Sequence, residues 1–372
     1  MANTADRTAD AIAKRGHVVR VFTVSKVPRD ELRRISKGRY DVETIPSVGL
    51  PIYLGVRATV PVGLALRKTA RFVPDIIHSH TPFSMGWEAV WAARFLKVPL
   101  VGTHHTFFDH YLKHVHLDYA WARRLSWKLT VGYYNRCDLV ISPTKSLADE
   151  LVKHGLWRPR QIVPNIVDSE LFHLAKGVPA LKQRLGLSEK VVVHMGRLSY
   201  EKSVDRVLHA FVQVFKREPR ATLIIVGDGP DKNALEVLAK NLGLSECVRF
   251  TGFIHGSTLV EYIQAADVFL TASKSENMPL AVLEAMACGL PIVAVRSLGL
   301  SEIVEDGKNG YLVPPDDVLA MAEHGRELLR DDELRARFSA SSHALSEKYA
   351  ESAVAEQLER LYQLTIDKHL HA

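Results

Sequence analysis

Apolar runs along the chain alternate with stretches in which apolar residues recur at helical spacing. Short runs rich in β-branched residues are typical of buried parallel strands, and the stretches between them are typical of helices that cover such a sheet. In the first half the pattern predicts strands at 17–24, 75–80, 99–105 and 138–143, with helices at 3–15, 84–96, 119–136 and 144–154. From about residue 190 the rhythm restarts, with strands at 190–196, 221–229, 247–253, 267–273 and 291–295.

The stretch 163–180 carries Pro and Gly and has no clear period, which is typical of a linker. A chain of 372 residues also exceeds one comfortable hydrophobic core. The sequence therefore predicts an α/β protein with two doubly wound domains, parallel sheets in both and a cleft between them. In such sheets ligands bind beyond the carboxyl ends of the strands, so candidate chemistry is sought there.

Composition adds a setting for this fold. The chain is 47% hydrophobic and 24% charged, as expected of a soluble globular protein, and no apolar run approaches the roughly 18 residues of a membrane span. Charged residues stand where a signal peptide would have its apolar region. Three widely spaced cysteines argue against a disulfide framework or a zinc cluster. Together these features predict a cytoplasmic protein.

Charge is distributed unevenly along the chain. The first 178 residues hold 26 Lys and Arg against 15 Asp and Glu, and the remainder holds 22 against 27. A basic first half attracts an anionic partner. Charge alone does not show whether this partner is nucleic acid, an anionic membrane or an acidic substrate.

The stretch "MGRLSYEK" (195–202) follows one predicted strand and precedes a helix that starts near Ser203. Gly196 permits a tight turn there, and Arg197 and Lys202 flank it. Two cations across a strand-to-helix turn can both reach a diphosphate, Arg in a bidentate way and Lys as a point charge. The plain alternative is a pair of solvated surface cations.

The stretch "SENMPLAVLEAMACGLP" (275–291) holds two acids, Glu276 and Glu284. Pro279 suits the first turn of a helix and Gly289 suits its end, so a helix is expected from about Pro279 to Cys288. Glu276 then precedes the helix and Glu284 lies within it. The backbone N–H groups at the helix start form a ready anion site, and they belong to Asn277, Met278 and Leu280. The plain alternative is a loop acid and a surface helix acid.

Taken together, the two stretches resemble the group 1 glycosyltransferases, which are retaining enzymes that use nucleotide-sugars. The segments "VPNIVD" (163–168) and "GDGP" (227–230) extend the resemblance over most of the chain. It implies the GT-B fold, two Rossmann-like domains whose parallel sheets face a central cleft. It also implies a cofactor-free reaction in which the nucleotide-sugar is a substrate, with no metal required.

The resemblance assigns roles to residues. Arg197 and Lys202 would neutralise the donor diphosphate, Glu276 would hold the sugar and Glu284 the ribose. The end of the strand at "TGFI" (251–254) would meet the nucleobase. Asn277-Met278-Pro279 departs from the family's usual Gly-Phe-Gly, which leaves the donor sugar open. The implied donor-binding residues are Gly196, Arg197, Lys202, Phe253, Ile254, Glu276, Asn277, Met278, Pro279, Leu280 and Glu284.

The acceptor side carries a second resemblance. The segment "GTHHTFFDHY" (102–111) matches His105 to the family histidine beside the reacting carbon, so the catalytic set becomes His105, Glu276, Arg197 and Lys202. The neighbouring histidines, His104, His110, His114 and His116, are expected to line the cleft or the surface rather than bind metal. With "SHTPFSMG" (79–86), this segment is similar to bacterial diacylglycerol glucosyltransferases and phosphatidylinositol mannosyltransferases.

Residues 119–136 combine aromatic and basic side chains. Such a helix can lie on an anionic membrane, and the alternative is a packed helix with a basic rim. The membrane or acceptor candidates are Trp121, Arg123, Arg124, Trp127 and Lys128. A cytoplasmic protein held peripherally on the inner face of the cell membrane is the corresponding location.

Three domain segments are expected. They are an acceptor-binding domain at 1–170, a nucleotide-sugar domain at 180–346 and a final helix at 347–372 that packs back toward the first domain. The family opens with a strand and a Gly-rich loop, whereas "GHVVRVFTV" (16–24) matches its second strand. The first strand is therefore expected to be missing: either the first domain is truncated at its N-terminus, because the start codon was placed too late, or its sheet has lost a strand.

The expected function is transfer of a hexose from a nucleotide-sugar such as UDP-glucose to a membrane lipid such as diacylglycerol. Alternatives are a mannosyl- or other hexosyltransferase acting on phosphatidylinositol or a soluble sugar, an epimerase, and a nucleotide-binding remnant without catalysis. A nicotinamide-dependent dehydrogenase fits poorly because no G-x-G-x-x-G follows a first strand. Nucleic acid fits poorly because the aromatic residues cluster on one helix.

Overall fold

The computed structural model describes residues 2–24, 36, 38–49, 57–59, 63–106 and 119–371. These residues fall into two units. Unit 1 comprises residues 1–166 together with 351–372, and unit 2 comprises Val167–Ala350. The chain thus passes from unit 1 to unit 2 within the predicted linker, and its last helix returns to unit 1.

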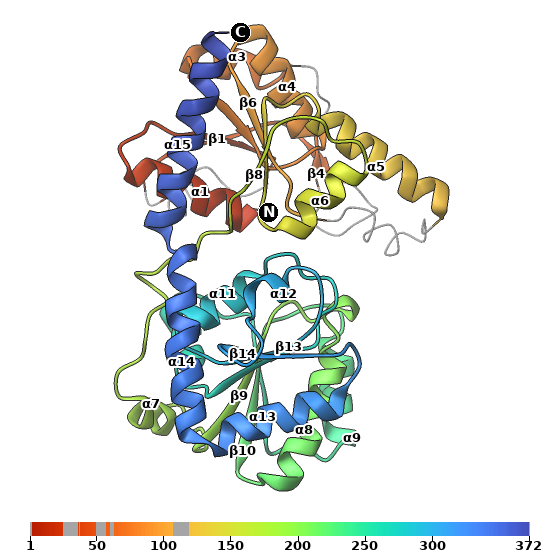
Figure 1. The fold of residues 1–372 in the computed structure, drawn as a ribbon, viewed down its shortest axis with the longest axis vertical. Coiled ribbons are helices and arrows are strands. Elements are labelled where there is room, and N and C mark those ends of the chain that lie inside the picture. The colour runs from red at the N-terminus through yellow and green to blue at the C-terminus, as the bar shows by residue number, and fades with distance from the viewer. Residues whose placement is uncertain are drawn as a thin grey trace. The chain divides into compact units, whose positions relative to one another are not determined.

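Unit 2 is built on one parallel sheet of six strands in the order β11-β10-β9-β12-β13-β14. Figure 1 shows these strands in the middle of the unit, with helices on both sides. Val, Ile and Leu dominate the strands, and most of these side chains are buried, as a sheet covered on both faces requires. The strands are β9 (Lys190–Met195), β10 (Ala221–Val226), β11 (Val248–Gly252), β12 (Val268–Thr271), β13 (Ile292–Val295) and β14 (Gly310–Val313).

Most helices of unit 2 bury an apolar face, whereas α7 has no buried residue. In α8 the buried residues include Val204, Val207, Leu208, Phe211 and Val214, which share one side at helical spacing. The α-helices are α7 (Val178–Arg184), α8 (Val204–Arg217), α9 (Lys232–Asn241), α10 (Gly256–Gln264), α11 (Leu280–Ala287), α12 (Leu300–Ile303), α13 (Val318–Arg330) and α14 (Asp332–Ser346). Two 3₁₀ turns, η2 (Tyr200–Lys202) and η3 (Glu347–Tyr349), complete the unit's described helices.

Unit 1 contains a parallel sheet in the order β5-β6-β7-β8, a separate parallel pair β1-β2 and a short antiparallel pair β3-β4. These strands are β1 (Arg20–Thr23), β2 (Asp41–Thr44), β3 (Val48–Gly49), β4 (Arg57–Ala58), β5 (Ile77–Ser79), β6 (Leu100–Thr103), β7 (Leu139–Ser142) and β8 (Arg160–Ile162). In the family, the first strand belongs to this unit. The expectation that this strand is missing here stays a prediction.

The last helix of the chain, α15 (Glu351–Leu370), packs on the first, α1 (Ala2–Lys14). Ala11 and Ile12 of α1 share a buried cluster with Val354 and Leu358 of α15. The ion pair between Lys14 and Glu351, at 2.8 Å, adds a polar contact at the rim. The remaining described helices of unit 1 are α3 (Leu66–Phe72), α4 (Ser84–Leu96), α5 (Ala120–Tyr134) and α6 (Lys145–Lys153).

The predicted strands and helices are confirmed, with strands shorter than expected. The strand predicted at 17–24 spans only Arg20–Thr23, and that at 221–229 ends at Val226 because the glycines after it turn away. The pattern did not reveal β2, β3, β4, β8 or β14; β2 and β8, with the sequences DVET and RQI, hold too few apolar residues to indicate a buried strand. Among the described helices, none combines the length and the apolar character that crossing a membrane demands.

Candidate active site

The donor-binding candidates lie along one edge of the unit 2 sheet. Because all six strands are parallel, their carboxyl ends share that edge. In the order of the strands, the edge carries Phe253 after β11, Asp228 after β10, Arg197 after β9 and Glu276 after β12. Neighbouring strands lie about 4.8 Å apart, so roughly 14 Å separates the first of these positions from the last. That order suits an extended ligand lying across the strand ends.

The turns after β9, β10 and β11 are joined backbone to backbone. The N–H of Gly196 donates to the carbonyl of Val226, and the N–H of Gly227 donates to the carbonyl of Gly252, both at 3.0 Å. A Cβ added to Gly227 would lie 1.9 Å from the carbonyl oxygen of Gly196, so no larger residue fits there. The packing holds the turn of Gly196 and Arg197 in one place, with the Arg197 side chain exposed.

Lys202 and Glu276 meet at this edge. Nζ of Lys202 lies 2.6 Å from Oε1 of Glu276, and both side chains are largely buried, with 22% and 17% of their surface exposed. Lys202 ends η2, directly before α8, and Glu276 follows β12. The two motifs recognised in the sequence therefore converge, although 74 residues separate them along the chain.

The loop that carries Glu276 is held from behind by Gly299. The N–H of Gly299 donates to the carbonyl of Glu276 at 3.1 Å, and a Cβ on Gly299 would lie 1.2 Å from the carbonyl oxygen of Asn277. Ser297 Oγ also donates to the carbonyl of Ser273 at 3.2 Å. This support was not predicted, because nothing around Gly299 in the sequence shows what it packs against.

Helix α11 starts one residue later and ends one residue earlier than predicted. Pro279 caps it and Cys288 follows its last turn, so the prediction from the Pro and Gly signals is confirmed. Met278 is buried, and Leu280 opens the first turn. Glu284 is also buried, with 7% of its surface exposed, which rules out the surface-acid alternative.

At the other end of the edge, the side chains of Phe253 and Ile254 differ in exposure. Phe253 is 77% exposed and its ring stacks near that of His255, with centroids 6.0 Å apart. Ile254 packs against the core of unit 2. An exposed aromatic ring beside a glycine turn offers a flat apolar surface of the kind a nucleobase stacks on.

In unit 1, His105 follows β6 and makes a hydrogen bond to His80, which follows β5. Nε2 of His105 lies 3.0 Å from Nδ1 of His80, and the two rings are nearly parallel with centroids 5.2 Å apart. Burial, followed by the field of His80, holds the pKa of His105 well below its usual range. Burial also lowers the pKa of His80 to about 4. Both rings are therefore neutral at physiological pH.

His78 extends this buried histidine group. Its Nδ1 lies 2.6 Å from the hydroxyl of Tyr362 on α15, and its Nε2 lies 2.6 Å from Oγ1 of Thr103. Burial, with weaker contributions from His80 and His105, holds the pKa of His78 well below its usual range. Neither His78 nor His80 was among the predicted site residues, although both lie within the strand predicted at 75–80.

One expectation about the histidines is wrong. His104 does not line a cleft or the surface; it is fully buried, with its ring edge-on to Tyr134 at a centroid distance of 5.1 Å. Burial lowers the pKa of His104 to about 3. His110, His114 and His116 lie outside the described residues. In the parts of the chain that the structure describes, no group of three His, Cys, Asp or Glu could hold a metal ion.

The assignment of Trp127 to a membrane-facing surface is also wrong. Its ring is 6% exposed, stacks on His154 at a centroid distance of 4.1 Å and belongs to a hydrophobic cluster of unit 1. At about 100° per residue, Trp127 lies some 120° around α5 from Trp121, which is 62% exposed. The sequence shows aromatic content, but only packing decides which side of the helix is buried.

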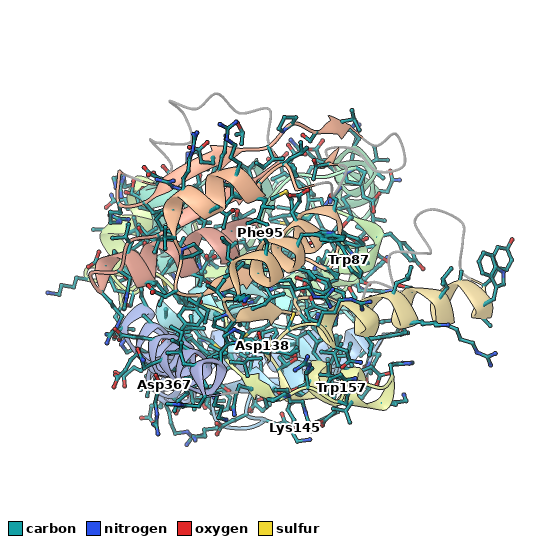
Figure 2. All side chains as sticks on the ribbon, turned by 90° about the horizontal axis from the view of Figure 1, so that it is seen from above. Trp87, Phe95, Asp138, Lys145, Trp157 and Asp367 are labelled. Carbon is teal, nitrogen blue, oxygen red and sulfur yellow. The ribbon has the colours of Figure 1, made fainter. Side chains whose placement is uncertain are left out.

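The exposed side of α5 has an order of its own. Trp121, Leu125 and Leu129 follow at intervals of one turn and are 62%, 47% and 63% exposed. Arg124 and Lys128 lie beside them within an arc of about 140°, whereas Arg123 points some 200° away from Trp121. Within the described chain neither Arg124 nor Lys128 has an ion-pair partner. Figures 1 and 2 show the N-terminal end of this helix projecting away from the other described parts of unit 1.

Comparison with known proteins identifies the family. Residues 180–344 match the glycosyl transferases group 1, and residues 1–171 match Glycosyltransferase Family 4. An alpha-monoglucosyldiacylglycerol synthase from Acholeplasma laidlawii is 31% identical over 85% of this chain and 81% of its own length. The chain belongs to the group 1 glycosyltransferases. It is therefore an enzyme that takes a sugar from a nucleotide-sugar, and the dehydrogenase alternative falls away.

Other members of the family show its range. An alpha-monoglucosyldiacylglycerol synthase from Streptococcus pneumoniae is 30% identical over 96% of this chain and 80% of its own length. A GDP-mannose-dependent alpha-mannosyltransferase from Corynebacterium glutamicum is 27% identical over 82% of this chain and 70% of its own length. The Anabaena protein HepE, solved in complex with UDP-glucose, is similar with a TM-score of 0.77 and 22% identity over 97% of this chain and 94% of that one. The predicted GT-B fold is confirmed.

Proposed function

We propose that this glycosyltransferase moves a hexose from a UDP-glucose-like donor to the hydroxyl of a membrane lipid such as diacylglycerol, with retention at the transferred carbon. The observation that carries the donor half is the meeting of Lys202 and Glu276 beside the start of α11. The acceptor half is supported by the exposed face of α5 and by the similarity to two monoglucosyldiacylglycerol synthases.

In the proposed complex the donor lies along the sheet edge. The base stacks at Phe253 and Ile254, Glu284 binds the ribose, and the diphosphate lies between Arg197, Lys202 and the backbone of 277–280. Negative charge grows on the leaving phosphate as the glycosidic bond lengthens, and fixed cations and helix N–H groups stabilise that charge more than the ground state.

The ion pair between Lys202 and Glu276 fixes the positions of these two donor-binding side chains in the proposal. Each side chain keeps the other extended toward the same point, so little side-chain entropy remains to be lost when the donor binds. In the proposal Glu276 accepts hydrogen bonds from the sugar hydroxyls, and the ammonium of Lys202 is shared between Glu276 and a phosphate oxygen.

His105 contacts the transferred sugar in this proposal. Because its ring is neutral, it can accept or donate a hydrogen bond to a sugar hydroxyl without repelling the positive charge that develops at the reacting carbon. His80 keeps the ring in one orientation through the bond at 3.0 Å.

The acceptor reaches the enzyme from an anionic membrane surface, on which α5 lies. Trp121, Leu125 and Leu129 would enter the lipid interface, and Arg124 and Lys128 would meet the headgroups. These two cations also line an open pocket next to His154, which suits an anionic headgroup. The protein would thus be held peripherally on the inner face of the cell membrane.

A mannosyl donor is the second candidate, favoured by the similarity to the GDP-mannose-dependent enzyme, and the Asn277-Met278-Pro279 segment leaves the donor sugar open. A retaining transfer to phosphatidylinositol or a soluble sugar would use the same grip on the diphosphate.

The test is a product analysis. Purified enzyme is incubated with labelled UDP-glucose, UDP-galactose or GDP-mannose, and with vesicles that contain diacylglycerol or phosphatidylinositol. We expect labelled monoglucosyldiacylglycerol from UDP-glucose, with the α-anomer identified by NMR. A mannolipid from GDP-mannose alone would establish the second candidate, and release of free sugar with no lipid product in any arm would overturn the lipid acceptor.

A further inference from the structure

A buried histidine lies directly before the turn that carries Arg197. His194 stands near the end of β9 and is 2% exposed. Its Nδ1 lies 2.8 Å from the carbonyl oxygen of Leu270 on the neighbouring strand β12. A carbonyl oxygen only accepts, so Nδ1 carries the hydrogen, and the neutral ring presents an unprotonated Nε2.

This second nitrogen has no hydrogen-bond partner in the described part of the chain, although it is buried. A Cβ built on Gly196 would lie 3.9 Å from it, so Nε2 lies beside the turn after β9. A buried polar atom without a partner destabilises the fold, and native proteins hold few of them. Its place next to Gly196 points to a role in binding.

The charged groups that act on the ring are Glu276 and Lys202. Burial is the main cause that lowers the pKa of His194; the field of Glu276 raises it, and that of Lys202 lowers it. The ring of Phe269 is the aromatic neighbour, with centroids 6.3 Å apart. A diphosphate added at this turn would bring further negative charge and favour the protonated ring.

We propose that His194 is a further ligand of the donor diphosphate: on binding a nucleoside diphosphate it takes up one proton from solvent at Nε2 and donates that hydrogen to a phosphate oxygen. This inference rests on the proposed function, in that the turn after β9 holds the diphosphate. The proton adds a positive charge beside the leaving phosphate, and the bond to Leu270 keeps the ring in place. Donor binding then becomes linked to pH, with affinity falling as pH rises.

The test uses calorimetry of UDP binding to the full chain at one pH near 7, in buffers of low and high ionisation enthalpy. We expect the observed heat to change with the buffer in proportion to an uptake of up to one proton per UDP. The variant His194→Asn keeps a hydrogen-bond donor for the carbonyl of Leu270 but has no group at the position of Nε2. It should abolish the proton uptake and weaken UDP binding about 10- to 100-fold. His194→Gln places an amide donor near Nε2 and should restore affinity without the uptake.

His343 provides the matched control. Its Nδ1 also lies 2.8 Å from a backbone carbonyl in unit 2, that of Ala287, and His343→Asn should leave the proton uptake unchanged. If UDP binds the wild type with the same heat in every buffer, or if His194→Asn keeps the uptake, the role of His194 is overturned while the proposed function stands. If UDP fails to bind the wild type, the role of His194 and the proposed function are both overturned.

A second measurement on the wild type avoids any dependence on folding of the variants. The ¹⁵N shifts of the His194 ring should report the Nδ1–H tautomer in the free protein and a doubly protonated ring with UDP. An unchanged neutral ring in the complex would overturn the inference.

Discussion

At the scale of single residues, the proposed donor site is built from a few close approaches. Gly227 and Gly299 lie where any side chain would collide with a neighbouring carbonyl, and they bring the turn of Arg197 and the loop of Glu276 to fixed positions. Lys202 and Glu276 then meet at 2.6 Å. Each of these residues matters because of what it touches, and the touching groups come from distant parts of the chain.

Loss of either cation tests the grip on the diphosphate. Arg197→Ala and Lys202→Ala should each lower turnover by about 10²–10³-fold, as removal of one fixed transition-state donor does. Lys216→Ala, an exposed cation on α8, is the control and should retain full activity. Initial rates and thermal melting of all three variants decide the matter; near-normal turnover in Arg197→Ala or Lys202→Ala would contradict the assignment.

At the scale of elements, strand ends and helix faces decide function. The order β11-β10-β9-β12 arranges the candidate base, phosphate and sugar contacts along one edge, and α11 begins at that edge. Helix α5 presents two cations and three apolar side chains on one side and buries Trp127 on another. Its rotation about its own axis, rather than its composition, sets which residues can meet a membrane.

A matched pair of charge reversals tests the face of α5. Arg124→Glu should weaken binding to phosphatidylglycerol vesicles, while Arg123→Glu, one residue away but on a different side, should have little effect. Each basic residue near an anionic surface contributes about 1 kcal/mol, so the double variant Arg124→Glu/Lys128→Glu should bind about 30-fold more weakly or worse. Sedimentation with vesicles measures this, and equal losses for Arg123→Glu and Arg124→Glu would show an effect of net charge alone.

At the scale of the whole molecule, the two units differ in their buried histidines. Among its described residues, unit 1 holds four whose pKa is lowered by burial, His78, His80, His104 and His105. Among the described residues of unit 2 only His194 shares this property. Neutral histidines that stay buried link folding to pH, because the unfolded chain takes up protons that the folded one excludes.

Unit 1 should therefore be the acid-sensitive half. An unfolded histidine titrates near 6.5, so stability falls as pH drops below that value, by up to about 1.4 kcal/mol per pH unit for each group. Four such groups would cost up to about 5 kcal/mol at pH 5.5, a large share of a typical domain's stability. Hydrogen exchange of peptides from both units at pH 7.5 and 5.5 measures this; equal protection of the two units at pH 5.5 would contradict it.

The amino-acid sequence alone predicts the fold class, the strands that carry the candidate site and the donor candidates Arg197, Lys202, Glu276 and Glu284. It could do so because apolar periodicity reports burial, and because parallel strands place their carboxyl ends along one edge. The folded chain was needed to show that His80 bonds to His105, that Gly299 supports the loop of Glu276 and that Trp127 is buried. Those facts depend on contacts between segments far apart in the chain and on the rotation of one helix. The spacing of residues within a short stretch of sequence reveals neither.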